Sequence, residues 1–587
     1  MVIAKEILTE YKEVYEKAIK YVNEESKNDP PTDPFRSHYV ARDLLLELKE
    51  TLKNALSSVI AEEADNGQDD FTYTVLQAFI YRELGRIYVY TEEISTGERL
   101  LQDSLELVEA HKIKPEAIIC YVGALNEMGI VQANRTDYKE ALETLNKSEQ
   151  AYKQFLETGA KALCITDLFG TPDEIEQGKG PKELESLYTL CTYYLAQVYG
   201  HLGELEMSAE YCHLTLRRQL DLKSFEPIDF ALNAATLSQY FICKNMFKEA
   251  RHHLAAATHI LAEFEAVMLT PEMTEQQRAD MKDTFKHRYA DVARCWAKYG
   301  LALLCASKER LFNDDDDKVT EDVKRLTLDP NKYRFQGLKI DLYENRITAD
   351  YCLTFDDAKL VYHYVIDWLD QAKEYYKPDI EATEYAKIIK DYAELYQHIA
   401  FFEEDPNNQA KMQKRRAKYY EDLLELLNPV FYMGICRECW YGAGLSYCAI
   451  LDIKLDVMKE RRTPQPQDLQ KINQTCQKAI KHFGEFVKSY MDKNGETIKP
   501  NTDAEEQRKV LYAYFHLGRL HFKMITPDLN LQLENMNNSL KYYKLFTDEC
   551  AARTEVAETL QAEVGVCREM VNLLPLKIAN IKKRLPK

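Results

Sequence analysis

The chain has 587 residues, of which 45% are apolar, and 76 basic against 96 acidic residues give a net charge of −20. This length is too great for a single hydrophobic core, so two or more units are expected. The scarcity of glycine (20) and proline (18) argues against a β-rich fold. The negative charge disfavours nucleic acid and acidic membranes as partners but suits a basic protein partner, and it also serves solubility.

The 14 cysteines are spread along the chain and follow a charged N-terminal stretch, which predicts buried, reduced thiols in a cytoplasmic protein. Membrane insertion is not expected, because no apolar run approaches the roughly 18 residues that a membrane span requires.

Four helix–turn–helix patterns predict a repeat architecture, at about residues 78–110, 122–155, 189–222 and 231–264. Each has a small residue on its first helix and another on its second; these pairs are Gly85/Gly97, Gly129/Ala141, Ala196/Ser208 and Ser238/Ala250. Antiparallel helices approach closely only where side chains are small. A larger apolar residue, expected to fill the turn, stands three positions before the second small one, at Ile94, Tyr138, Leu205 and Phe247. The pattern resembles the tetratricopeptide repeat.

The remainder of the chain also reads as helical. Residues 293–304 and 511–522 look like isolated first helices of the same type, and helical segments are expected at 356–377, 383–403, 407–427, 430–460 and 467–491. The run NDDDDK at 313–318 is interpreted as a solvated linker. We therefore predict an all-α fold, a right-handed α-solenoid in two subdomains, with residues 1–310 and 331–587 joined by an acidic linker at 311–330.

Motifs that could carry catalysis or bind a cofactor are weak. The pair CREC at 436–439 lacks the second pair that a zinc site needs, and GAGLS at 442–446 lacks the third glycine of a phosphate loop. His252 and His253 are adjacent, so on a helix they point in different directions. The basic run at 411–418 reads as one exposed helix face. No enzyme activity, catalytic residue, metal or cofactor is predicted, and a solenoid without such a site is expected to bind a partner on its concave face.

A polar pair recurs in the third and fourth repeats. When Ala196 is aligned with Ser238, Tyr194 matches Thr236 and Gln197 matches Gln239. In both repeats a hydroxyl residue and a glutamine thus stand three apart on one helix face. The same slots hold Glu83 and Arg86 in the first repeat, and Glu127 and Ile130 in the second. These residues differ from the lysine–asparagine clamp of tetratricopeptide co-chaperones. The repeated hydroxyl–glutamine pair instead predicts a surface that forms hydrogen bonds with a partner.

Two long stretches carry a family resemblance. The sequences at 187–220 and 227–260 resemble the central block of the kinesin-binding protein family, and weaker similarity covers most of the chain, including 35–45, 400–424 and 539–585. The resemblance implies two tetratricopeptide-like subdomains that clasp kinesin motor domains. It implies that polar residues of the concave face make part of the contact, at Tyr194, Gln197, Gln219, Thr236 and Gln239. Gln219 comes from the resemblance alone.

The resemblance also implies a function. Members block the microtubule-binding surface of selected kinesins and are linked to axon outgrowth and microtubule organisation in neurons. The expected protein is cytoplasmic, associates with the cytoskeleton through kinesins, and does not itself bind microtubules. The acidic charge fits, because the kinesin surface that meets acidic tubulin is basic. Two alternatives stay open: a general scaffold or co-chaperone for short peptides, and an enzyme in an all-helical fold.

Overall fold

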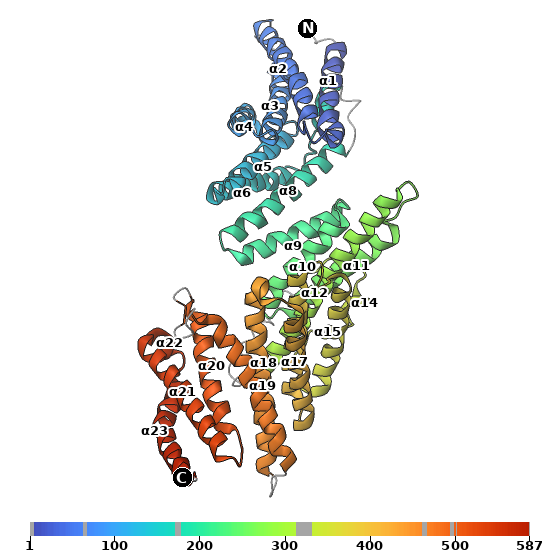
Figure 1. Cartoon of the computed structure of the whole chain (residues 1–587). Coiled ribbons are helices and arrows are strands. Elements are labelled where there is room, and N and C mark those ends of the chain that lie inside the picture. The colour runs from blue at the N-terminus through green and yellow to red at the C-terminus, as the bar shows by residue number, and fades with distance from the viewer. Residues whose placement is uncertain are drawn as a thin grey trace. The chain divides into compact units, whose positions relative to one another are not determined.

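The computed structural model describes residues 5–62, 67–170, 178–312, 331–460, 466–492, 498–499 and 502–585. Within these ranges the regular secondary structure is helical, apart from one isolated β-bridge between Met491 and Ile498. Successive helices pack as antiparallel pairs (Figure 1). The predicted all-α solenoid is confirmed.

Contacts between Cα atoms divide the chain into two compact units, Met1–Glu226 and Pro227–Lys587. The first unit consists of α1 (Lys5–Asn23), α2 (Arg36–Glu62), α3 (Gly67–Tyr90), α4 (Ile94–Val108), α5 (Ile118–Asn134), α6 (Tyr138–Glu157), the short α7 (Ile165–Leu168), α8 (Lys179–His201) and α9 (Leu205–Leu222). The first three predicted repeats are the pairs α3–α4, α5–α6 and α8–α9.

The second unit begins with the fourth predicted repeat, α10 (Pro227–Cys243) and α11 (Phe247–Val267). It continues with α12 (Glu275–Phe312), α14 (Asp341–Glu344), α15 (Phe355–Tyr375), α16 (Ala382–Phe402), α17 (Pro406–Leu426), α18 (Pro429–Glu460), α19 (Pro466–Tyr490), α20 (Ala504–Lys523), α21 (Leu529–Ala552), α22 (Thr554–Glu558) and α23 (Gln561–Arg584).

The division by contacts falls at 226/227, whereas composition predicts a linker at 311–330. Residues 313–330, which include the NDDDDK run, lie outside the described residues. The segment that follows belongs to the second unit by its contacts: the Tyr299 hydroxyl of α12 donates to the Thr348 carbonyl at 2.8 Å, and the Cys352 amide donates to Ser307 Oγ at 2.9 Å. The linker and the two-subdomain boundary there stay a prediction.

The small residues of the repeats lie where two helices approach closely, as predicted. A Cβ atom built on Gly97 of α4 would lie 2.8 Å from the Gly85 carbonyl oxygen of α3. In the third pair Ser208 Oγ of α9 donates to the Ala196 carbonyl of α8 at 2.8 Å. The small side chains therefore set the distance between the paired helices.

Replacing Gly97 by alanine should lower the free energy of unfolding by about 1–3 kcal/mol, because the new methyl group has no space. Its Cβ would lie 2.6 Å from Val89 Cγ2 as well as against the α3 backbone. Gly484 of α19 is the matched control, since a Cβ there meets nothing within 4 Å. Gly484→Ala should raise stability by about 0.5–1 kcal/mol. Urea unfolding of both variants measures the two shifts, and equal effects would contradict the close-packing account.

The larger residues before the second small one do not all fill their turns. Each is the first residue of its second helix, but Ile94 is 36% exposed and Leu205 is 56% exposed, so the prediction is wrong at these two positions. Phe247 is buried and meets the Tyr299 ring of α12 at 5.7 Å, while Tyr138 stacks on His201 of α8 at 4.4 Å. Tyr138 and Phe247 therefore contact aromatic rings of the next helix pair, and these contacts help to stack successive repeats.

The two segments predicted as isolated first helices have partners further along the chain. In α12, Gly300 packs against α15, where a Cβ would lie 2.2 Å from Val365 Cγ2. In α20, the Gly518 carbonyl accepts a 2.8 Å hydrogen bond from Ser539 Oγ of α21. In both, a glycine of the first helix lets the partner helix approach closely, and the contact lies further along the chain than the spacing of the four repeats.

A histidine joins the segment after residue 330 to α11. His252 is buried; its Nε2 accepts from the Phe335 amide at 2.8 Å, so this nitrogen carries no proton. Its Nδ1 therefore donates to Glu344 Oε1 at 2.7 Å. Arg251 donates to the Ile347 carbonyl at 2.8 Å. His252 thus has a structural role on this helix.

Candidate partner-binding face

The first helices of the repeats in the first unit lie next to one another, in the order α3, α5, α8. The slots aligned with Tyr194 and Gln197 therefore fall on neighbouring helices. We call the surface made by Arg86, Glu127, Tyr194 and Gln197 the first-helix face.

A buried ion-pair network lies on α3, at the start of the first-helix face. Glu83 is 2% exposed and forms ion pairs with Arg82 at 2.6 Å and with Arg86 at 2.7 Å. Arg82 also donates to the Ile119 carbonyl of α5 at 3.1 Å. Gly123 of α5 makes room for it, because a Cβ there would lie 2.5 Å from Arg82 Nη1. The network thus joins the first two repeats and leaves the Arg86 guanidinium partly exposed at the face.

The electrostatics of the carboxylates differ along this face. Burial opposes ionisation of Glu83, but the charges of Arg86 and Arg82 outweigh it and lower its pKa. Burial dominates at Glu127 of α5 and raises its pKa, although Arg86 lies close enough to oppose this. Glu183 of α8 behaves in the same way, with its pKa raised by burial. At and beneath the face, neighbouring arginines thus stabilise the charge of Glu83, whereas the charges of Glu127 and Glu183 are held at an energetic cost.

A buried asparagine fixes the next interface. Asn126 of α5 donates to the Leu187 carbonyl of α8 at 2.8 Å and accepts from Ser148 Oγ of α6 at the same distance. One amide group thus links three helices, and both of its hydrogen-bonding ends are used. This places α8 against α5 and sets where Tyr194 and Gln197 emerge.

Tyr194 and Gln197 lie one helical step apart on α8, as predicted. Tyr194 is half-buried at the edge of the first core and meets the Tyr193 ring edge-on at 5.2 Å. Its pKa is raised, mainly by burial and further by Tyr193 and Glu127. Gln197 is exposed. The pair combines an anchored aromatic ring with an exposed amide, which suits hydrogen bonding to a partner.

Gln219 occupies a different kind of position. It lies near the end of α9, a second helix, so it is outside the first-helix face. Its side chain is half-buried, and its buried Oε1 has no hydrogen-bond partner within the part of the chain that the structure describes. An unsatisfied buried acceptor of this kind lowers the stability of the free protein.

Thr236 and Gln239 belong to α10 of the second unit and are described separately. They share one face of the helix, with Thr236 exposed and Gln239 half-buried. Gln239 Nε2 donates to Ser238 Oγ at 3.1 Å, and Ser238 Oγ in turn donates to the Ala235 carbonyl at 2.6 Å. The predicted hydroxyl–glutamine pair is thus present on α10, as on α8.

The sequence pattern marked Glu83, Arg86 and Glu127 as slot residues but did not reveal the ion pairs of Glu83 with Arg82 and Arg86. Arg82 and Asn126 were not identified. A charged residue stands two places before the small residue of the first helix, at Glu83 and Glu127, and could have signalled a buried charge. Gly123 could have signalled room for a long side chain. Neither pattern predicts which residue of the neighbouring helix makes the contact.

The weak motifs of the sequence lie inside helices. Cys436 and Cys439 are buried in α18, and burial raises the pKa of the Cys439 thiol to about 12. In the same helix, Cβ atoms on Gly442 and Gly444 would lie 2.6 Å from Tyr420 and 2.8 Å from Phe483, so these glycines allow close helix packing. Among the described residues, no group of three His, Cys, Asp or Glu side chains is arranged to hold a metal ion. None of the described helices is long and apolar enough to cross a membrane.

Comparison with known proteins gives one consistent result. The family described as "KIF-1 binding protein C terminal" matches residues 228–581, which begins next to the start of the second unit. The chain is 58% identical to the KIF-binding protein of Drosophila melanogaster over 598 residues, covering 100% of this chain and 99% of the relative. It is 33% identical to that of Gallus gallus, covering 96% and 95%.

A solved structure agrees with this. The structure of "Kinesin binding protein (KBP)" has a TM-score of 0.65 to this chain at 27% identity and covers 96% of this chain and 98% of its own. The similarity of sequence and of fold extends over both units. The chain therefore belongs to the KIF-binding protein family.

Proposed function

We propose that this protein binds kinesin motor domains and blocks their attachment to microtubules, without catalysing a reaction. The observation that carries the proposal is the match over the whole length to relatives named for binding kinesins. The first-helix face of the first unit, Gln219, and the polar pair on α10 are the contact residues we propose.

Charge supports the same proposal. A kinesin surface that binds acidic tubulin is basic, and this chain carries a net charge of −20. Attraction between the two raises the rate of association, while the polar residues decide which partner stays bound. A solenoid seated on the motor excludes the microtubule by occupying the same surface, which requires no chemistry.

Such a protein would act in the cytoplasm and reach the cytoskeleton through kinesins. By removing motors from microtubules it would regulate microtubule-based transport, and through transport the organisation of axonal microtubules and axon outgrowth. It would have no direct affinity for microtubules, because both surfaces are acidic.

Co-sedimentation of a kinesin motor domain with microtubules tests the proposal. Adding this protein in excess should move the motor from the pellet to the supernatant, and the protein alone should stay in the supernatant. Raising the salt concentration should weaken binding of the protein to the motor, because the charge attraction is screened beyond about 8 Å at physiological ionic strength.

Two results would contradict the proposal. One is unchanged sedimentation of motors from several kinesin classes. The other is binding to isolated C-terminal peptides as tight as binding to whole partners, which would indicate a peptide scaffold of the co-chaperone type.

A further inference from the structure

Two lysines of the basic run at 411–418 line a pocket that the proposed kinesin contact does not use. Within the second unit, α17, α18 and α19 enclose a pocket of 520 Å³. Five lysines line it, with Asp468 as its single acidic lining residue; they are Lys411 and Lys414 of α17, Lys454 of α18, and Lys471 and Lys478 of α19. The chain has a net charge of −20, so a pocket lined by five lysines is unusual for it.

Most of these amines lack an opposite charge. Lys478 donates to the Tyr447 hydroxyl at 2.9 Å and has Glu421 at 3.7 Å. Lys454 donates to Thr475 Oγ1 at 3.2 Å. Among the described residues, no carboxylate stands within ion-pair distance of Lys411, Lys414, Lys454 or Lys471.

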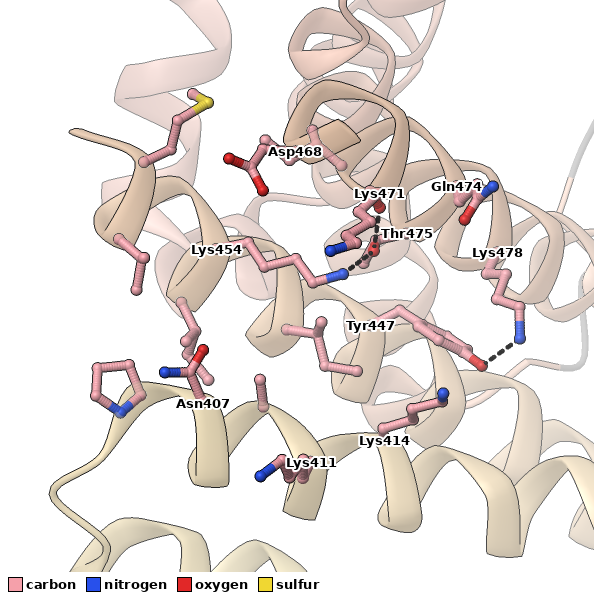
Figure 2. A pocket seen from close by; sticks show the side chains of 17 residues that line it. Asn407, Lys411, Lys414, Tyr447, Lys454, Asp468, Lys471, Gln474, Thr475 and Lys478 are labelled. Carbon is pink, nitrogen blue, oxygen red and sulfur yellow. Dashed lines mark hydrogen bonds between the residues drawn. The ribbon is translucent and has the colours of Figure 1, made fainter. Parts of the chain in front are cut away.

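The lysines act on one another. Figure 2 shows Lys454 extending from α18 toward Thr475 of α19, next to Lys471, with Lys414 approaching from α17. Lys454 is half-buried, and its pKa is lowered by burial and then by the charges of Lys471 and Lys414. The free pocket thus holds like charges close together, and an anion would relieve their repulsion.

The floor of the pocket is apolar. Ile450, Ile453, Val457 and Met458 recur along one side of α18, and Ile472 of α19 adjoins them. A ligand that carried only phosphate groups would leave this floor without a partner. A ligand with carboxylates beside aliphatic or aromatic side chains would use both the floor and the lysines.

We propose that this pocket binds a short acidic segment of another protein, with its carboxylates against the lysines and an apolar side chain on the α18 floor. Its volume lies within the range of about 300–1,000 Å³ that is usual for ligand sites, so it takes a few residues of extended chain. The pocket is positively charged, so it does not attract the basic surface of the motor. The pocket therefore provides a second binding site, for a partner of opposite charge.

Fluorescence anisotropy on the full chain tests the proposal with a labelled peptide of alternating glutamate and leucine. The same peptide with glutamine in place of glutamate should not bind. Lys454→Met combined with Lys471→Gln should weaken binding about tenfold, as two charge-assisted contacts are lost. Lys471→Gln alone, at an exposed position, should weaken it about threefold and guards against misfolding of the double variant.

Two further variants decide between ligands. Lys481→Gln removes an exposed charge of α19 that does not line the pocket, and it should leave affinity unchanged. Ile453→Ser alters the floor and should weaken the peptide without affecting inositol hexakisphosphate, used as a competitor. The proposal is overturned by equal loss with Lys481→Gln or by no effect of Lys471→Gln. It is also overturned if inositol hexakisphosphate or vesicles containing phosphatidylserine bind at this site while the peptide does not.

Discussion

Replacing Glu83 by alanine should lower the free energy of unfolding by about 3–5 kcal/mol, because it breaks a buried ion-pair network from its centre. Glu83 is 2% exposed and is the carboxylate shared by Arg82 and Arg86. Its loss leaves the Arg82 guanidinium between α3 and α5 without its counter-charge. The first two repeats should then separate, and amide hydrogens of α3 and α5 should exchange faster.

Glu127→Gln is the control, because the opposite effect on the free energy of unfolding is expected. The pKa of Glu127 is raised by burial, so its charge is unfavourable in the folded chain at neutral pH. Removing that charge should leave stability unchanged or increase it.

The pH dependence separates the two carboxylates. Because the folded-state pKa of Glu83 is lowered, its contribution is present above the unfolded pKa of about 4.3 and is lost as the pH falls through the folded value. The contribution of Glu127 is present below the unfolded pKa and is lost as the pH rises through its raised folded value.

The tryptophans allow the two units to be followed separately. Trp296, Trp368 and Trp440 all belong to residues 227–587, so tryptophan emission reports the second unit alone. Hydrogen exchange measured by mass spectrometry reports α3 and α5 directly. Unchanged exchange in these helices in Glu83→Ala would show that the network does not hold them together.

Changing Tyr194 and Gln197 together to alanine should weaken binding to a kinesin motor domain by about tenfold or more. Half-buried aromatic residues flanked by polar groups contribute a large share of binding energy at protein interfaces. Tyr194 is held by the edge of the core, so little side-chain freedom is lost on binding, and the exposed Gln197 amide offers both a donor and an acceptor. Surface plasmon resonance with an immobilised motor domain measures the change.

The controls for this pair address folding and specificity. Tyr194 packs on the core, so circular dichroism must show a folded double variant, and Gln197→Ala alone should lose affinity without any structural change. Gln154→Ala removes an equally exposed glutamine from α6, a second helix, and should bind normally. Wild-type affinity in the folded double variant would show that the motor contacts another surface.

The sequence by itself determined the helical repeats. Small residues at fixed spacing marked where paired helices touch, and Gly85 with Gly97 and Ala196 with Ser208 make those contacts. Local spacing suffices there, because a helix, a short turn and a second helix bring such residues together without help from the rest of the chain. For the same reason the polar pairs of α8 and α10 could be recognised from alignment.

Only the tertiary structure decided what lies between helices that are distant in sequence. It paired α12 with α15, inserted Arg82 of α3 into the space left by Gly123 of α5, and gathered lysines of α17, α18 and α19 around one pocket. The register of one helix against another depends on side-chain volumes and on contacts such as those of Glu83. The periodicity of a single helix does not reveal these contacts.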